Sequence, residues 1–334
     1  MSKDKTLLQN YLELRPNLEK IYVVPEISTK DTENNYLYLL YKHIIDDKEK
    51  NIQLINTTIA DYPKIFWRKL KGEKNIYHQH WYHLSKFRDL FHFAWRTYWI
   101  FMYRLVGGKV VWTVHNIAPH HGKFRCFNWF WRRFLALIAT KLHVHCSEAI
   151  TIMSKKLGVR KKKFFVVEHP DYPIQQGSRN ESLKELNQRY ANNKIKDSDI
   201  IFLAFGLIGK YKKIKETAQI FIDLPPNKKL IIAGKIRQTE ENYLEEIKSI
   251  IKDKQNIFLV DNAIPDEELP IFFNSADYLI LNYDQVLTSG VLYLGLSYNK
   301  RIIAIDKGCI KDNQNTNIIK FKDEIQLKEI VSAL

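Results

Sequence analysis

The stretch IIFLAFGLIGKYKK, residues 200–213, joins six apolar residues to two glycines and three lysines. A continuous apolar run of this length is typical of a strand that is buried on both faces, as in a parallel sheet. Glycines and lysines after such a strand predict a turn into a helix at the sheet edge where α/β proteins bind ligands, and they would suit a diphosphate. The spacing is neither that of a Walker A loop nor GxGxxG, so an ordinary turn with a solvated basic face is the alternative interpretation.

On either side of this stretch, strand-like apolar runs alternate with amphipathic helical stretches, which is the pattern of parallel sheets with crossover helices. We therefore predict an α/β fold whose second half is doubly wound. The predicted strands of the second half are Ile200–Phe205, Lys229–Ala233, Ile257–Val260, Tyr278–Leu281 and Arg301–Ile305, with helices near Lys213–Asp223, Glu240–Lys252, Asp266–Asn274 and Gly290–Tyr298. Those of the first half are Lys20–Val24, Ile52–Ile55, Ile76–Gln79, Lys109–Val114, Leu142–His145 and Phe164–Val167.

The length of 334 residues favours two α/β domains of roughly 150 residues each over a single core. The composition changes across Glu168–Ser198, which is rich in Asn, Gln, Ser, Lys and Pro. All eleven histidines lie at or before His169, and all seven tryptophans lie at or before Trp131. We predict an N-terminal domain over residues 1–170, a linker over 171–198 and a C-terminal domain over 199–334.

The net charge of +15 indicates an anionic partner, either nucleic acid, anionic lipid or a phosphorylated substrate. Three cysteines, an odd number without CxxC spacing, argue against a disulfide framework and favour a reducing compartment. The charged N-terminus lacks the pattern of a secretory signal, and no apolar run is long enough to span a bilayer. The expected location is the cytoplasm.

A second loop of the C-terminal half, LNYDQVLTSG over residues 281–290, also follows a predicted strand. Its Thr288, Ser289 and Gly290 open a helix, where hydroxyls and free backbone N–H groups form an anion site aided by the helix dipole. A plain helix cap by Thr288 or Ser289 is the alternative, and a cap is compatible with a phosphate site.

Histidines follow two predicted strands of the first half. His115 and Asn116 stand at the carboxyl end of a central strand, where α/β folds place ligands, although a structural histidine is the alternative. An earlier strand ends in HQHWYH, residues 78–83. His78 and His80 share one strand face and could together bind a metal. We predict no metal there, because neither Asp/Glu nor Cys stands close by.

Together these motifs resemble those of the GT-B glycosyltransferases, in particular bacterial members that build capsular, exopolysaccharide or lipopolysaccharide sugars. The resemblance covers nearly the whole chain and rests on the order and spacing of His80-Trp81, Thr113–Ile117 with Pro119-His120, Glu168–Pro170, Phe205–Leu207 with Tyr211-Lys212, and Leu287–Gly290. It implies two Rossmann-like domains facing across a cleft. The C-terminal domain would bind a UDP- or GDP-linked sugar and the N-terminal domain a lipid-linked or polysaccharide acceptor.

The resemblance also implies roles for individual residues. The donor-binding candidates are Gly206, Gly209, Lys210, Lys212, Tyr283, Thr288, Ser289 and Gly290, and the acceptor-binding candidates are His80, Trp81, Asn116, His120 and His169. Lys212 and the helix amides would stabilise the negative charge that develops on the leaving diphosphate. His115 would take the acceptor proton in an inverting enzyme, since an ordinary histidine pKa near 6.5 suits a base, or hydrogen-bond a sugar in a retaining one.

Two departures from the family pattern leave the stereochemical outcome open. The acidic E-x7-E pair common in retaining members would fall at Leu287 and Gly295, and the arginine expected after the strand glycine is Leu207. Lys212 keeps the other half of that basic pair. No DxD pair follows a predicted strand, and the family replaces a metal by positive groups, so we expect no metal and no cofactor besides the sugar nucleotide.

An aromatic helix predicted over Lys86–Arg104 and six basic residues within Lys155–Lys163 indicate a protein that binds the inner surface of the cell membrane. The alternative for the helix is that it faces the core of the N-terminal sheet. A nucleic-acid-binding protein is the rival function, although no recognition motif is present. A nucleotide-sugar epimerase is a second rival, disfavoured because GxGxxG and YxxxK are absent from the right context.

Overall fold

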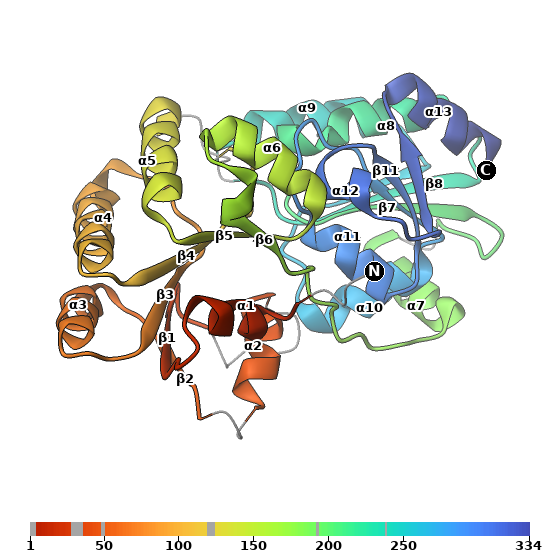
Figure 1. Cartoon of the computed structure of the whole chain (residues 1–334). Coiled ribbons are helices and arrows are strands. Elements are labelled where there is room, and N and C mark those ends of the chain that lie inside the picture. Colours follow the sequence, from red (N-terminus) through yellow and green to blue (C-terminus); the bar gives the residue numbers. More distant parts are fainter. Residues whose placement is uncertain (1–4, 28–35, 48–50, 119–123, 192–193, 238) are drawn as a thin grey trace. The chain divides into compact units, whose positions relative to one another are not determined.

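A computed structural model describes residues 5–27, 36–47, 51–118, 124–191, 194–237 and 239–334. The chain divides into two compact units, Met1–Pro170 and Asp171–Leu334, and each unit has its own parallel sheet (Figure 1). None of the described helices combines the length and the apolarity needed to cross a bilayer.

The first unit contains a six-stranded sheet in the order β2-β1-β3-β4-β5-β6. Its strands are β1 Lys20–Val24, β2 Gln53–Asn56, β3 Asn75–Gln79, β4 Lys109–Thr113, β5 Lys141–Val144 and β6 Phe164–Val166. Its helices are α1 Leu7–Leu14, α2 Tyr36–Ile45, α3 Tyr62–Leu70, α4 Leu90–Leu105, α5 Arg125–Ile138 and α6 Ser147–Leu157, with short 3-10 turns at η1 Ile59–Asp61, η2 Phe87–Asp89 and η4 Lys161–Lys163.

Helices cover both faces of the first sheet because successive strand residues point to opposite sides. Ile21 and Val23 of β1 share a core with α1 and α2, and Ile76 of β3 belongs to the same core. Tyr22 lies on the other face, where its hydroxyl accepts a hydrogen bond from Arg68 of α3 at 2.9 Å. Residues of β3 at even positions, including His78, therefore face α1 and α2.

The second unit contains a six-stranded sheet in the order β12-β11-β10-β7-β8-β9. Its strands are β7 Ile200–Phe205, β8 Lys228–Ala233, β9 Ile257–Val260, β10 Tyr278–Leu281, β11 Arg301–Ile305 and β12 Ile318–Phe321. Its helices are α7 Arg179–Leu186, α8 Ile214–Ile222, α9 Glu241–Ile251, α10 Leu269–Ser275, α11 Gly290–Ser297, α12 Gly308–Asp312 and α13 Glu324–Ala333, with a π-helical turn at η5 Asn187–Ala191 and 3-10 turns at η6 Lys210–Lys212 and η7 Asp266–Glu268.

The two sheets confirm the prediction of an α/β fold with two Rossmann-like units. Strand β12 and helices α12 and α13 are additions to the elements predicted for the second half. Strand β12 lies at the edge of the sheet, and three of its four residues, in the sequence IIKF, are only partly buried. Its apolar run is therefore too short to predict a strand from the sequence.

Residues 171–198, predicted as a linker, belong to the second unit and include α7. Leu183 and Leu186 lie in the core of that unit at 1% exposure, where α7 packs against α10. They are the two apolar residues of an eight-residue helix, RNESLKEL. The polar composition therefore reflects a helix with a narrow buried stripe rather than a free connection.

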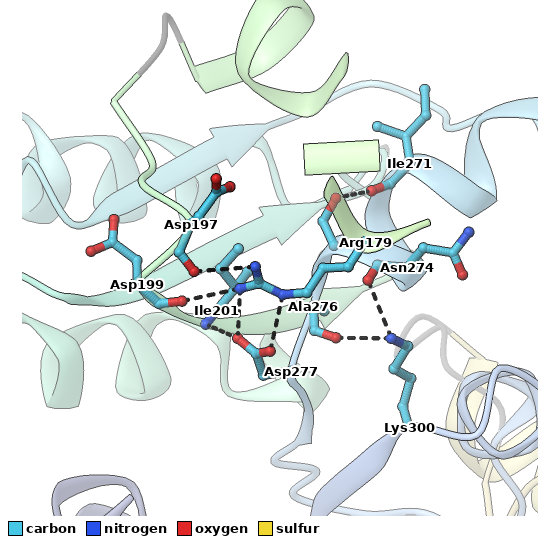
Figure 2. A network of polar contacts seen from close by, with 10 residues as sticks. Arg179, Asp197, Asp199, Ile201, Ile271, Asn274, Ala276, Asp277 and Lys300 are labelled. Carbon is cyan, nitrogen blue, oxygen red and sulfur yellow. Dashed lines mark hydrogen bonds and ion pairs between the residues drawn. The ribbon is translucent and has the colours of Figure 1, made fainter. Parts of the chain in front are cut away.

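Polar contacts at the amino-terminal edge of the second sheet hold α7 in place (Figure 2). Arg179 donates hydrogen bonds to both carboxylate oxygens of Asp277 at 3.3 Å. Its guanidinium also donates to the backbone carbonyls of Asp197 at 3.2 Å and Asp199 at 3.1 Å. Asp277 in turn accepts the backbone N–H of Ile201 at 2.8 Å. This network joins α7 to the first residues of β7 and β10.

Candidate active site

The second sheet reverses its strand order between β7 and β10. Strands β8 and β9 lie on one side of β7, whereas β11 and β12 lie beyond β10. The loops that leave the carboxyl ends of β7 and β10 therefore run in opposite directions, and open α/β sheets bind ligands at such a point. Both loops predicted to bind a diphosphate, residues 206–213 and 282–289, begin there.

Two glycines bring the loops after β7 and β8 into backbone contact. Gly206 has a φ of +87° and Gly234 a φ of +145°, values that side chains rarely allow. A Cβ atom on Gly234 would lie 2.3 Å from the carbonyl oxygen of Gly206. A Cβ atom on Gly206 would lie 3.0 Å from Nζ of Lys212 and 3.2 Å from Cγ2 of Val291. Gly206 is therefore next to both a lysine ammonium group and the first turn of α11.

Lys212 is a buried cation, 6% exposed, at the end of the short turn η6. Its Nζ donates a hydrogen bond to the carbonyl oxygen of Phe205 at 2.7 Å, its one hydrogen bond within the described part of the chain. An ammonium group has three N–H bonds, so it can still donate to an anionic ligand. Burial lowers the pKa of Lys212 to about 7, and an anion bound beside it would restore its full positive charge.

The start of α11 adds hydroxyl and backbone N–H groups at the same edge. Ser289 caps the helix, because its hydroxyl accepts the N–H of Leu292 at 3.2 Å. The Tyr283 hydroxyl lies 2.8 Å from that of Ser289, and the Thr288 hydroxyl lies 3.3 Å from Sγ of Cys309. The predicted cap therefore exists, and the first N–H groups of the helix have no partner within it.

The loops after β7 and β10 are also joined to each other. The rings of Tyr211 and Tyr283 stack with centroids 6.1 Å apart and an interplanar angle of 9°. The backbone N–H of Asp284 donates to the carbonyl oxygen of Tyr211 at 2.8 Å. Of the predicted donor-binding residues, the structure therefore brings together Gly206, Lys212, Tyr283, Thr288, Ser289 and Gly290.

Gly209 and Lys210 have a different environment. The backbone N–H of Lys210 donates to the Glu240 carboxylate at 2.6 Å, and a Cβ atom on Gly209 would lie 3.1 Å from the same carboxylate. Glu240 also pairs with Arg237, at 3.1 Å, and the Arg237 guanidinium lies 6.0 Å from the centroid of the Tyr211 ring. Arg237, which the sequence reasoning missed, is thus a second cation beside this loop.

Packing accounts for the two missing acidic residues. Leu287 is 2% exposed, and its carbonyl oxygen accepts the N–H of Cys309 at 2.8 Å. Gly295 lies on the sheet side of α11, where a Cβ atom would be 2.5 Å from Cδ2 of Leu279. Both positions are buried, so a carboxylate at Leu287 would lose its solvent, and a side chain at Gly295 would collide with Leu279.

The first unit gathers histidines from successive strands at one edge of its sheet. His80 follows β3, His115 follows β4, His145 follows β5 and His169 comes after β6. The ring of Tyr36, the first residue of α2, lies 5.0–6.3 Å from each of the four imidazole rings, centroid to centroid. These five residues form what we call the histidine cluster.

Three further residues were predicted to bind the acceptor, Trp81, Asn116 and His120. Two of them lie beside the histidine cluster. Trp81, 38% exposed, stacks on His115 with centroids 4.6 Å apart and an interplanar angle of 13°. The backbone carbonyl oxygen of Asn116 accepts a hydrogen bond from the buried Arg132 of α5 at 2.5 Å. His120 lies outside the described residues.

Hydrogen bonds occupy both ring nitrogens of the two histidines considered as metal ligands. In His78, Nδ1 contacts the hydroxyls of Tyr11 and Tyr41, and Nε2 lies 2.7 Å from the hydroxyl of Thr113. In His80, Nε2 lies 2.9 Å from the Tyr41 hydroxyl, and Nδ1 lies 3.1 Å from Nε2 of His115. No group of three metal-ligating side chains occurs in the described residues.

Burial keeps the histidine cluster neutral. It lowers the pKa of His115 well below 6.5, and repulsion from His80, His145, His169 and Arg132 acts in the same direction. Burial lowers the pKa of His145 to about 4 and that of His169 to about 3. His115 therefore does not keep the ordinary histidine pKa assumed from the sequence, and at pH 7 it is uncharged.

The residues that the sequence reasoning missed in this unit are His143, His145 and three tyrosines, Tyr11, Tyr36 and Tyr41. His143 and His145 repeat the alternate spacing of His78 and His80, which was a usable signal. The tyrosines come from α1 and α2, more than thirty residues before their partners, His78 on β3 and His145 just after β5, and no local pattern marks them.

Comparison with solved structures places both units in one known fold. HepE of Anabaena, solved with UDP-glucose, superposes with a TM-score of 0.66 over 94% of this chain and 89% of that one, at 12% identity. A glycosyltransferase of Rickettsia africae gives 0.59 over 95% and 87% at 13% identity. WaaG, a glycosyltransferase involved in lipopolysaccharide biosynthesis, gives 0.54 over 94% and 90% at 13% identity. The fold is therefore GT-B, as predicted.

No protein-family model and no curated protein matches the chain by sequence. The similarity is thus one of fold.

The neutral histidine cluster makes the first unit sensitive to acid. The unfolded chain binds protons on these histidines below pH 6.5, whereas the folded chain does so only near pH 3 to 4, so stability is lost as the pH falls through this window. We predict a loss of about 3 kcal/mol or more between pH 7 and pH 4. Tryptophan fluorescence in urea measures it, since every tryptophan lies in this unit.

The variant His145→Gln is the control, because it removes one of these titrating groups and should make the pH dependence shallower. Equal free energies of unfolding at pH 7 and pH 5 in the wild-type protein would contradict the assignment.

Proposed function

We propose that this protein is a glycosyltransferase that takes a sugar from a nucleoside diphosphate and adds it to a cell-envelope glycan acceptor. The observation that carries the proposal is the buried Lys212 beside Gly206 and the start of α11, at the point where the second sheet reverses its strand order. A structural lysine would be fully paired, whereas this one keeps donor capacity next to the first turn of α11. HepE, which has the same fold, was solved with UDP and with UDP-glucose.

In this proposal the diphosphate binds among Lys212, Ser289 and the first N–H groups of α11. Transfer breaks the bond between the anomeric carbon and the β-phosphate oxygen, and the electron pair leaves with the nucleoside diphosphate. Lys212 meets that growing negative charge, and the loss of solvent around it makes the interaction stronger than in water. These positive groups take the place of a metal, so transfer needs no metal or cofactor.

The histidine cluster is the proposed site for the acceptor or the transferred sugar. His169 belongs to it, Trp81 offers an exposed ring on which a sugar can stack, and Asn116 follows the same strand as His115. His80 is fully buried with hydrogen bonds at both ring nitrogens, so it would act on the acceptor only through His115. His115 is neutral at pH 7 and can therefore accept the proton of the acceptor hydroxyl as the new bond to the anomeric carbon forms.

The substitution Lys212→Met separates binding from stability. Methionine fills similar space without a buried charge, so the free protein should become more stable by roughly 1 kcal/mol at pH 7, while its affinity for the best nucleoside diphosphate falls by about tenfold or more. A thermal-shift screen with UDP, GDP and their sugar conjugates first identifies that ligand, because about 100 times the Kd stabilises by roughly 2.7 kcal/mol. Calorimetry then gives both affinities.

Lys213→Met is the matched control, because Lys213 pairs with Glu324 at 2.7 Å and should not meet the ligand. The proposal fails if no nucleoside diphosphate stabilises the protein. It also fails if Lys212→Met lowers stability and leaves the affinity unchanged, since Lys212 would then be a structural residue.

We further propose that the first unit binds the inner, anionic surface of the cell membrane, where a lipid-linked acceptor would be found. Helix α4 buries Phe93 and Ile100 in the core yet exposes Phe91 at 71% and Leu105 at 63%. Its inner face is that of a core helix, and its exposed apolar face supports the interpretation as an interfacial anchor.

Neighbouring helices extend this apolar surface. α3, α4 and α5 lie side by side in Figure 1, and ring contacts join them. The large apolar side chains that they and η2 expose are Trp67, Leu70, Phe87, Phe91, Tyr98, Phe101, Leu105, Trp129, Phe130 and Leu137. Most of the basic residues of 155–163 are also exposed, whereas Lys163 caps α5 by donating to Ala136 and Leu137 at 2.7 Å.

The double substitution Phe87→Ser with Phe91→Ser tests this surface. Each side chain is more than 70% exposed, so the fold should persist, while binding to vesicles that contain anionic lipid should weaken roughly tenfold or more. Ile325→Ser, on the second unit and 74% exposed, is the control and should bind as the wild type does. Cosedimentation with vesicles measures both.

Binding to an oligonucleotide that is tighter than binding to these vesicles, at matched salt, would instead favour the nucleic-acid alternative.

A further inference from the structure

One continuous series of hydrogen bonds crosses the first unit beneath the candidate site. It begins at the carbonyl oxygen of Val167 and ends at His115, and its members in order are His143, Thr113, His78, Tyr41, His80 and His115. We call these six residues the relay. The first five are fully buried, so bulk water does not supply alternative partners.

The carbonyl end fixes the direction of the first three hydrogen bonds. A carbonyl oxygen only accepts, so His143 Nε2 carries a hydrogen and donates to Val167 at 3.1 Å. His143 is neutral because burial lowers its pKa, and its Nδ1 must accept from the Thr113 hydroxyl at 2.9 Å. Thr113 then accepts from His78 Nε2 at 2.7 Å, which leaves Nδ1 of His78 as an acceptor.

Two tyrosine hydroxyls meet that acceptor. Tyr11 and Tyr41 both contact Nδ1 of His78, their oxygens are 3.3 Å apart, and Tyr41 also lies 2.9 Å from Nε2 of His80. Nδ1 has one lone pair and takes one hydrogen. The four contacts are those of His78 with Tyr11 and with Tyr41, of Tyr11 with Tyr41, and of Tyr41 with His80. One tyrosine hydroxyl donates to His78. If the other donates to its fellow tyrosine, His80 can donate to Tyr41, and three of the four contacts are hydrogen bonds. If Tyr41 instead donates to His80, only two of the four are.

The better-satisfied arrangements all place the hydrogen of His80 on Nε2. Its Nδ1 therefore accepts a hydrogen bond from Nε2 of His115 at 3.1 Å. We infer that the relay holds His115 as the Nε2–H tautomer and leaves Nδ1 as the nitrogen that accepts a proton. Nδ1 has no hydrogen-bond partner among the described residues, whereas Nε2 is committed to His80.

If the proposed function holds, the direction of the relay hydrogen bonds helps His115 to accept a proton on Nδ1 against the charges around it. The groups that face it are His80 from β3, Arg132 from α5, Tyr36 from α2, and His145 and His169 after β5 and β6. Repulsion opposes a positive charge on His115, and it comes from the three histidines and from Arg132. Hydrogen bonds that all point from His115 toward the Val167 carbonyl favour that charge, because each donor polarises the next.

Thr113 provides a test outside the candidate site. Thr113→Val keeps the shape of the side chain and removes the hydroxyl, whereas Thr113→Ser keeps the hydroxyl. In protein labelled with ¹⁵N-histidine, long-range proton–nitrogen spectra report which ring nitrogen of His115 is protonated. We expect one tautomer, Nε2–H, in the wild type and in Thr113→Ser, and loss of that single tautomer in Thr113→Val and in Tyr41→Phe.

Tyr82→Phe is the control, because Tyr82 is a buried tyrosine of the same unit whose hydroxyl pairs with Thr97 at 2.7 Å. The inference is overturned if wild-type His115 carries its hydrogen on Nδ1. It is overturned equally if Thr113→Val keeps the wild-type tautomer. If the valine variant does not fold, Tyr41→Phe takes its place, and the same result in that variant overturns the inference. The spectra need no substrate, so a failed nucleotide screen would sink the proposed function and leave this result standing.

Discussion

Parallel pairing of β7 with β10 is the constraint on which the second unit depends. The second sheet is covered by helices on both faces, so the interiors of its strands are mostly apolar and offer little place for polar chemistry. The carboxyl ends of the strands are the exception, and at the strand-order reversal the two adjacent loops leave room for a ligand. Gly234 then allows a backbone contact with Gly206 that any side chain on Gly234 would prevent. Lys212 lies in the loop that leaves β7 at this point, with its Nζ beside Phe205 and Gly206.

Both candidate sites hold ionisable groups in places that oppose their charge. Lys212, His80, His145 and His169 are buried, and burial lowers the pKa values of Lys212 and of the four histidines of the cluster. Such groups reduce the stability of the free protein, and buried ionisable groups with perturbed pKa values concentrate at functional sites. In the second unit the proposed counterion is a ligand anion, and in the first unit the relay supplies the hydrogen bonds.

The sequence predicted those parts of the fold that local patterns determine. Apolar runs and strand-end glycines were sufficient for eleven strands, and His80, His115 and Lys212 follow β3, β4 and β7 as the sequence predicted, while their roles stay predictions. Residues brought in from elsewhere in the chain were missed. Glu240 occupies the N–H of Lys210, and Tyr41 reaches His80 from α2.

Burial explains the remaining differences between the expected and the observed sites. The ordinary pKa assumed for His115 depended on solvent that the folded unit excludes. Likewise α7 has a polar sequence, and its place in the second unit depends on Leu183, Leu186 and the contact between Arg179 and Asp277. Such long-range contacts carry no local sequence signal.

Hydrogen exchange with and without the best nucleoside diphosphate tests the central claim most directly, because it reports the binding site without assuming a reaction. We predict slower exchange of backbone amides in residues 206–213 and 283–292, with the segment 226–232 of the same sheet unchanged. Slower exchange confined to other segments, at ligand concentrations that saturate binding, would contradict it.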